Sequence, residues 1–299
     1  MSKVVFVHGV GKQYLSEDSL ARDVVPELLG GIRLAGGPVP SYDEVAVAFY
    51  GDLFRPRGTR SLGEPPYDEA DIETDEEFAL LMEWWAAAAR TDPQVPAPDA
   101  PGTRGPAGWA ASRSLRLNAV RAALDALTGA RCLRGVLDRA LIGSLKQLTG
   151  YLTDEAVRQA ARDRLAARIT PRTRAVVAHS LGSVVAYETL CDPERNRDWD
   201  VRMLVTLGSP LGMRALVLDR LDPVPPERRA VWPKPLRAWT NVADVTDIVA
   251  VVRELRPAFG DAVDDVLVDN GSHMHDATRY LTAVETGRAI ATGLLPEAD

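Results

Sequence analysis

Short runs made entirely of apolar residues, each joined to a helical pattern, limit how this chain can fold more than any other feature. Val4 to Val7 is such a run, and residues 174–178 and 201–207 hold two more. A strand that is apolar throughout is buried on both faces, which is typical of a parallel sheet. We therefore expect an α/β fold whose mostly parallel sheet is covered by helices on both faces. Further strands are expected at 44–49, 236–242 and 265–268.

A long helical stretch separates these strands into two groups. No comparable strand pattern occurs between Asp52 and Pro171. Thr74 and Glu77 have the spacing of a capping box at the start of its first helix. We expect a single domain spanning residues 1–299, with a helical insertion at 52–171 between the second and third strands. Helices are expected at 19–34, 74–90, 110–127, 131–148, 153–169, 181–190 and 277–292.

The charge balance argues against a nucleic-acid partner. The formal net charge is −7, whereas binding a duplex requires a clustered positive face. Arginines do gather between Arg158 and Arg174, but acids and alanines interrupt them, so we interpret them as a solvated helix face.

The rest of the composition predicts a cytoplasmic protein. Cys132 and Cys191 are the only cysteines, which favours a reducing compartment. The segment before His8 is too short for the apolar part of a signal peptide, and no apolar run approaches the ~20 residues that span a bilayer. No integral membrane segment is expected, and the oligomeric state stays open.

One serine stands where a strand pattern passes directly into a helical one. Ser180 follows the apolar run 175–178 and precedes helical spacing from Leu181 onward. A tight turn lifts such a hydroxyl above the sheet edge and aims the helix N-terminus at a developing oxyanion. The turn requires small residues two positions before and after the serine, and Ala178 and Gly182 stand there. A plain helix N-cap serine is the alternative.

This arrangement resembles the nucleophile elbow of the α/β-hydrolase family, in its lipase- and esterase-like branch. Ala178 departs from the strict G-x-S-x-G pattern but still fits a crowded turn. His8, Gly9 and Val10 after the first strand resemble the family's HG-x oxyanion loop. The resemblance implies that the backbone N–H groups of Val10 and Leu181 form the oxyanion hole.

The resemblance also implies an acid after a later strand, and two residues compete for this role. Asp247 and Asp244 both follow the strand pattern that ends near residue 242. Asp247 is followed by Ile248 and Val249, as in related lipase-like sequences, so we favour it over Asp244. The acid would orient the imidazole of the base and stabilise its cation.

The base must come after the last strand, where the chain offers His273 and His275. In the family the base commonly opens the C-terminal helix with an aromatic residue nearby, and His275 with Tyr280 matches this pattern better. A metal site on the two histidines is the competing interpretation, which the lack of a nearby cysteine or further histidine disfavours. We therefore expect no metal.

Four more residues are expected to line the substrate site: His8, Gly9, His179 and Ser209. His8 precedes the serine in the chain, so we expect it to shape its loop rather than act as the base. Nucleotide motifs fail at this loop, because a P-loop would need Gly at Phe6 and Ser or Thr at Gln13, and a dinucleotide fingerprint would need Gly at Tyr14. No cofactor is expected.

The insertion carries an apolar stripe that has two interpretations. Leu133, Val136, Leu137, Leu141, Leu145 and Leu148 recur along one helix face. A core-facing helix is the favoured interpretation. The alternative is a lid that covers an acyl pocket and makes peripheral contact with an interface. Met82, Trp84 and Trp85 would line the same cavity or anchor the lid.

Together these features predict a serine hydrolase that cleaves a small-molecule carboxylic ester or thioester through an acyl-enzyme on Ser180. The same residues would serve an amidase or an acyltransferase. The rival from another class is a non-catalytic ligand-binding or interaction protein on a hydrolase scaffold. Such proteins usually lose a triad residue, and all three residue types are present here in the order Ser, acid, His.

Overall fold

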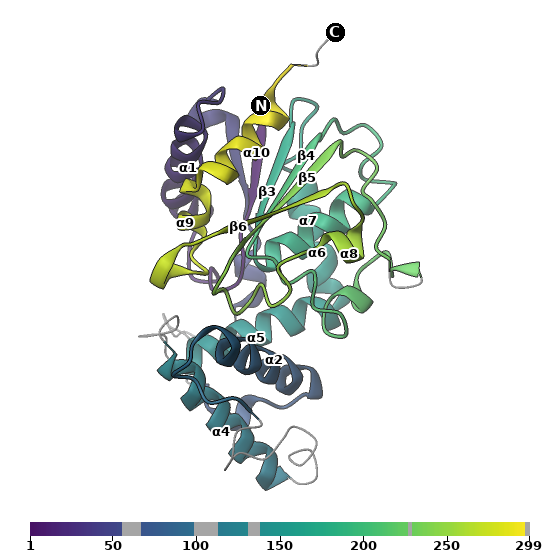
Figure 1. Ribbon diagram of the computed structural model, residues 1–299. Coiled ribbons are helices and arrows are strands. Elements are labelled where there is room, and N and C mark those ends of the chain that lie inside the picture. The colour runs from purple at the N-terminus through teal and green to yellow at the C-terminus, as the bar shows by residue number, and fades with distance from the viewer. Residues whose placement is uncertain (56–66, 99–112, 131–137, 227–228, 297–299) are drawn as a thin grey trace.

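Six parallel strands form one sheet, in the order β2-β1-β3-β4-β5-β6 (Figure 1). The computed structural model describes residues 1–55, 67–98, 113–130, 138–226 and 229–296. Val4 lies opposite Val45 on one side and Ala175 on the other, so β1 is an inner strand. The strands are β1 (Val4–Val7), β2 (Val45–Ala48), β3 (Ala175–His179), β4 (Met203–Leu207), β5 (Ala238–Asp244) and β6 (Val263–Val268).

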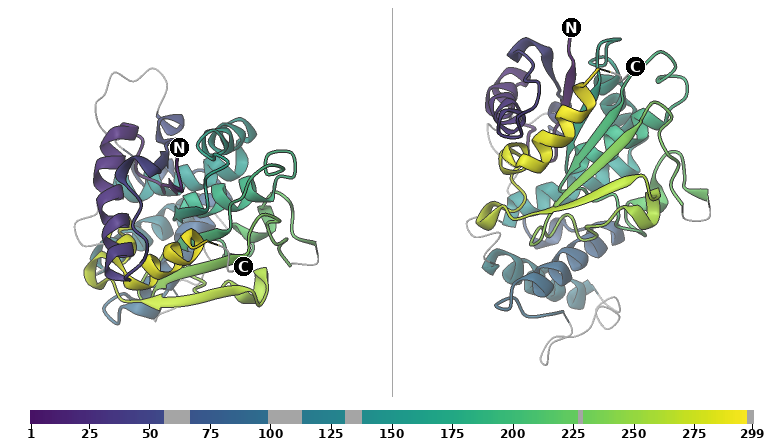
Figure 2. Two further views of the ribbon diagram at one scale, coloured as in Figure 1. Left: turned by 90° about the horizontal axis from the view of Figure 1, so that it is seen from above. Right: turned by 45° about the horizontal axis from the view of Figure 1, so that its top comes forward.

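Three of the inner strands are buried throughout because helices cover both faces of the sheet. Each residue of β1, β3 and β4 is buried, as expected for predominantly apolar strands in a parallel sheet. Helices α1, α9 and α10 pack on one face, and α6, α7 and α8 on the other (Figures 1 and 2). The predicted α/β architecture with helices on both faces is confirmed.

Most predicted helices are found within a few residues of the expected bounds. The helices are α1 (Glu17–Leu34), α2 (Asp75–Thr91), α4 (Arg113–Gly129), α5 (Asp138–Thr153), α6 (Glu155–Ala166), α7 (Leu181–Cys191), α8 (Arg256–Phe259), α9 (Ala277–Thr282) and α10 (Val284–Leu294). Short 3₁₀ helices are η1 (Tyr42–Glu44), η2 (Gly51–Phe54), η3 (Glu69–Asp71), η5 (Leu218–Arg220) and η7 (Gly271–His273). The capping box of Thr74 and Glu77 is present at α2.

The prediction of a single C-terminal helix at 277–292 is wrong, because the structure has two helices there. Ala283 adopts an extended conformation, with φ −60° and ψ 135°, and divides the segment into α9 and α10. The two pieces can therefore pack at different angles. One result is that Tyr280 of α9 is buried near the carboxyl end of β5, where it donates a hydrogen bond to Asp247.

Helices α2, α4 and α5 lie beyond the carboxyl ends of the strands (Figure 1). They occupy the chain between β2 and β3, where the insertion was expected. Leu141, Leu145 and Leu148 of α5 are buried in a core that continues into the face of the sheet covered by α7, so the core-facing interpretation is confirmed for them. Leu133, Val136 and Leu137 lie outside the described residues.

The aromatic residues of α2 belong to the same core. Met82, Trp84 and Trp85 are all buried. The Trp85 indole N–H also donates to the carbonyl of Pro96, at 2.7 Å, and so fixes the chain that follows α2. Trp85 therefore joins two parts of the insertion to each other.

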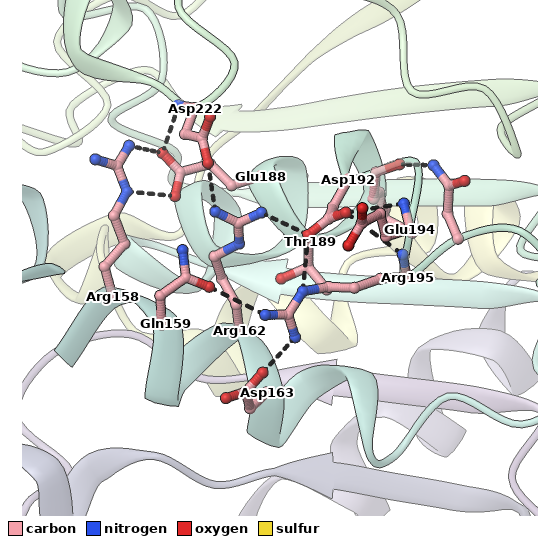
Figure 3. Close-up of polar contacts among 12 residues, drawn as sticks. Arg158, Gln159, Arg162, Asp163, Glu188, Thr189, Asp192, Glu194, Arg195 and Asp222 are labelled. Carbon is pink, nitrogen blue, oxygen red and sulfur yellow. Dashed lines mark hydrogen bonds and ion pairs between the residues drawn. The ribbon is translucent and has the colours of Figure 1, made fainter. Parts of the chain in front are cut away.

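The arginines of α6 correct a second prediction, because two of them are not on a solvated face. Arg158 forms a bidentate ion pair with the fully buried Glu188 of α7 (Figure 3). Arg162, with a side chain only 4% exposed, bridges Asp192 and Asp222 (Figure 3). The local pattern of acids and alanines does not indicate these partners, because the acids that face the arginines lie in α7, at its end and in the loop after η5.

No helix within the described part of the chain is long and apolar enough to cross a membrane. Cys191, at the end of α7, is a free thiol whose pKa burial raises to about 12. Cys132 lies outside the described residues.

Candidate active site

Ser180 occupies a sharp turn between β3 and α7. It has φ 53° and ψ −127°, and it is the one residue other than glycine with positive φ in the described ranges. Such a conformation costs about 1–3 kcal/mol and persists only where the surrounding structure enforces it. Gly182 allows α7 to approach β1, because a Cβ there would come within 2.5 Å of the Val7 carbonyl oxygen. The turn therefore needs the small residue that the sequence provides.

The ring of His275 reaches the serine from the loop between β6 and α9. The Ser180 hydroxyl lies 3.0 Å from Nε2 of His275. Nδ1 of the same ring lies 2.7 Å from Oδ2 of Asp247. A carboxylate only accepts hydrogen bonds, so the proton sits on Nδ1 and the Nε2 lone pair faces the serine. This tautomer can take the serine proton.

Asp247 is buried and holds four hydrogen bonds. Oδ1 accepts from the N–H groups of Val249 and Ala250, and Oδ2 accepts from His275 and from the Tyr280 hydroxyl at 2.8 Å. Burial alone would raise the pKa of this carboxyl, but the facing His275 ring and these donors outweigh it and hold the pKa below its ordinary value. Asp247 is therefore ionised at neutral pH.

Asp244 and His273, the alternative candidates for the acid and the base, lie in different surroundings. Asp244 is also buried, but its carboxylate accepts from Thr246 and from the N–H of Asn270, which closes the turn after β5. His273 is exposed in η7. Of the candidates named from the sequence, the structure brings together Ser180, Asp247 and His275.

Two residues that sequence reasoning did not assign complete this cluster. Tyr280 accepts a hydrogen bond from the Asp244 N–H and donates one to Asp247, so it joins the strand end to the acid. Gly208, with φ +55°, leaves the room that the acid and base occupy, since a Cβ there would lie 2.7 Å from Oδ2 of Asp247. Of the residues around Gly208, only its neighbour Ser209 was predicted from the sequence to line the substrate site.

The loop after β1 passes directly against the serine. A Cβ on Gly9 would lie 2.6 Å from the Cβ of Ser180, so only glycine fits. His8 donates from Nδ1 to the carbonyl of Gly9 at 2.7 Å and accepts at Nε2 from the N–H of Tyr50 at 3.0 Å. The Tyr50 hydroxyl donates to the His8 carbonyl. Both ring nitrogens of His8 are thus used inside the protein, and the ring shapes its loop.

The two predicted oxyanion donors belong to the segments that adjoin the serine: Leu181 follows it in the chain, and Val10 follows Gly9, which packs against it. Leu181 is the first residue of α7, and the first N–H groups of a helix have no partner within that helix. Val10 follows Gly9 in the loop, and its N–H makes no hydrogen bond to the described residues. Both N–H groups are therefore available to a bound oxygen.

His179 and Ser209 complete the residues expected at the site. Nε2 of His179 donates to the carbonyl of His275 at 3.1 Å, and its ring packs on that of His275 with centroids 4.7 Å apart. Burial, with a further contribution from His275, lowers the pKa of His179 well below its ordinary value, so the ring is neutral. Ser209 is buried, and its hydroxyl accepts from the N–H of Leu211.

Within the described residues, no group of three or more His, Cys, Asp or Glu side chains is placed to hold a metal ion. No protein-family model matches the sequence, and a search of curated proteins finds no significant match. Inference about function therefore depends on the geometry of the site.

Proposed function

We propose that this protein is a serine hydrolase of the α/β-hydrolase fold, which cleaves a carboxylic ester or thioester through an acyl-enzyme on Ser180. The observation that carries the proposal is the continuous hydrogen-bonded chain from the Ser180 hydroxyl through His275 to Asp247. A serine hydroxyl is a poor nucleophile unless a base removes its proton during attack. His275 is in hydrogen-bond reach of that proton and carries the correct tautomer.

In the first half of the reaction, Oγ of Ser180 attacks the carbonyl carbon as its proton moves to Nε2 of His275. The carbonyl oxygen becomes an oxyanion, which the N–H groups of Val10 and Leu181 stabilise. Asp247 stabilises the imidazolium and does not take the proton. When the tetrahedral intermediate collapses, the bond to the leaving oxygen or sulfur breaks, and His275 protonates that atom.

In the second half, water repeats these steps on the acyl-enzyme. His275 removes a proton from water as the water oxygen attacks the acyl carbon. The second intermediate releases the acid and returns the proton to Ser180. No net oxidation or reduction occurs. An amide substrate, or an alcohol acceptor in place of water, would use the same steps.

The insertion is proposed to act as a lid above this site. Its helices α2, α4 and α5 lie at the carboxyl ends of the strands, and Ser180 follows the carboxyl end of β3 (Figure 1). Ligands of parallel α/β sheets bind at this edge. A cover of helices there would restrict which acyl groups reach Ser180 and would exclude water.

A fluorophosphonate probe tests the proposal, because it labels only an activated serine. We expect labelling of the wild type and its loss in Ser180→Ala and His275→Ala. His273→Ala is the matched control, since His273 is exposed in η7 and makes no contact with the Ser180–His275 pair among the contacts described above, and it should keep wild-type labelling. Each variant's folding is checked by its thermal midpoint.

A folded wild type that stays unlabelled, with and without detergent, would contradict the proposal and favour a non-catalytic ligand-binding protein. Labelling only in detergent would indicate a lid that is closed in water. Labelled wild type would then be tested with a panel of esters and thioesters of increasing acyl length.

A further inference from the structure

A long polar side chain is buried on α5, away from the leucine stripe. Gln147 stands between Leu145 and Leu148 in the sequence and is only 6% exposed. A buried amide costs free energy unless its donors and acceptor find partners. Its partners are therefore informative about why an amide stands there.

Both functional groups of Gln147 bond to the loop that follows β1. Oε1 accepts from the backbone N–H of Gly11 at 3.0 Å. Nε2 donates to Oε1 of Gln13 at 3.1 Å, and Gln13 is itself buried. The N–H of Gly11 can only donate, so the orientation of the Gln147 amide is fixed. These bonds span more than 130 positions of the sequence and join the insertion to the segment that contains Val10.

The loop is thus held from two sides. On the side of the sheet, His8 holds the Gly9 carbonyl, and in a trans peptide this also sets the direction of the Val10 N–H. On the side of the insertion, Gln147 holds the next peptide through the Gly11 N–H. Gly11 has φ +77°, which glycine adopts without strain, and it has no side chain of its own to anchor the chain at this point. The hydrogen bond to Gln147 supplies an anchor there.

We propose that Gln147 is a positioning residue: it fixes the Val10–Gly11 peptide, and together with His8 on the preceding peptide it holds Val10 from both sides, so that the Val10 N–H is ready to receive the oxyanion. The proposal rests on the proposed function for its catalytic consequence. It assigns α5 a part in assembling the catalytic site as well as covering it. Catalytic donors must be held in place before the reaction to be effective, and a group that fixes them acts on the transition state more than on bound substrate.

Gln147→Met tests this, because methionine keeps the length and burial of the side chain and removes both hydrogen bonds. Removing an oxyanion donor outright lowers kcat by about 10²–10³-fold. For a donor that is displaced and not removed, we expect a loss of about 10- to 100-fold in kcat for p-nitrophenyl acetate, with KM changed less than about twofold. Thr149→Val is the control, since Thr149 is buried on the same helix but donates within it, to Leu145.

Two further readouts separate positioning from a general loss of stability. A trifluoromethyl ketone forms a tetrahedral adduct on serine, and its affinity should fall with kcat/KM in Gln147→Met and stay unchanged in Thr149→Val. Amide hydrogen exchange across residues 8–15 should be faster in Gln147→Met by at least about tenfold and unchanged in the control. The exchange measurement does not require catalysis.

The outcomes distinguish the two proposals. Unchanged exchange in Gln147→Met overturns the positioning role whether or not the wild type hydrolyses the ester. Faster exchange with an unchanged kcat in an active enzyme overturns it as well. An inert wild type with faster exchange in Gln147→Met supports the control of this loop by α5 and overturns the hydrolase proposal.

Discussion

At the scale of single residues, His8 makes the stability of the protein depend on pH, although it takes no part in the proton transfer from Ser180. Burial lowers the pKa of His8 from 6.5 to about 4. Between these values the unfolded state binds more protons than the folded state, so stability rises with pH across that window and is fully present above it. From pH 7 to pH 5 the wild type should lose about 2 kcal/mol of unfolding free energy through His8.

His8→Gln should remove this part of the pH dependence, even though it lowers stability at every pH. Urea unfolding of both proteins at pH 5 and pH 7 measures the difference directly. Equal losses in the two proteins between these pH values would show that His8 is not held neutral. His179, whose pKa is also lowered, contributes in the same direction in both proteins.

Tyr280 is the second residue whose role can be measured. In Tyr280→Phe, Asp247 loses one donor and becomes a stronger acceptor, which favours the protonated His275 ring. We expect kcat/KM to fall about 3- to 10-fold and the acid limb of its pH profile to move to higher pH. The buried Asp244 N–H also loses its acceptor, at a cost of about 1–3 kcal/mol.

Tyr187→Phe is the matched control for this measurement. Tyr187 is buried and donates a single hydrogen bond to the carbonyl of Val231, away from the site. It should lose stability without any shift of the pH profile. A profile that moves equally in both variants would contradict the role given to Tyr280.

The residues of the site differ in how well the sequence could predict them. Ser180 stands at a pattern boundary, and chain order narrowed the acid and the base to two candidates each. Gln147 and the Tyr280 hydroxyl carry no such mark, because their partners lie far away in the chain. An amide among leucines has the same sequence pattern whether or not it meets Gly11.

At the scale of elements, buried charges attach the insertion to the helix that follows Ser180. Glu188 of α7 accepts hydrogen bonds from Arg158 of α6 and from the N–H of Asp222 (Figure 3). It also accepts one from the Tyr151 hydroxyl of α5. Removing one partner of a buried ion pair leaves an uncompensated charge, which costs about 3–5 kcal/mol. Arg158→Met should therefore lower the unfolding free energy by about that amount.

Urea unfolding of three variants tests this attachment. Arg168→Met is the control, because the Arg168–Glu17 pair is exposed and such pairs contribute at most about 1 kcal/mol. The double variant Arg158→Met/Glu188→Gln should recover much of the loss, since no unpaired charge remains. A loss in Arg158→Met as small as that in the control would contradict the assigned role.

The elements themselves followed from the sequence where local pattern decides them. All six strands and the start of α2 were predicted, because apolar runs and a capping box act locally. The break at Ala283 and the burial of Arg162 were not predicted, because both depend on residues that come together only in the folded chain. The acids that neutralise Arg162 come from the end of α7 and the loop after η5.

At the scale of the whole molecule, the insertion and the sheet form one unit. Hydrogen bonds from α5 reach the loop after β1, and ion pairs from α6 reach α7, the helix that begins after Ser180. Removing residues 52–171 would therefore remove contacts to both of these segments, so the insertion supports elements that carry the candidate site.

The sheet order has a consequence for how the protein is made. Val4 of β1 pairs with Ala175 of β3, which lies 171 positions further along the chain. Ribosomes add about 5–20 residues per second, so β1 waits about 10–30 s for that partner. Two strands are marginal on their own, so β1 and β2 gain the support of the wider sheet only once residues 175–179 have been synthesised. The amino-terminal strand of this protein is therefore among the first segments made and among the later ones to complete its pairing.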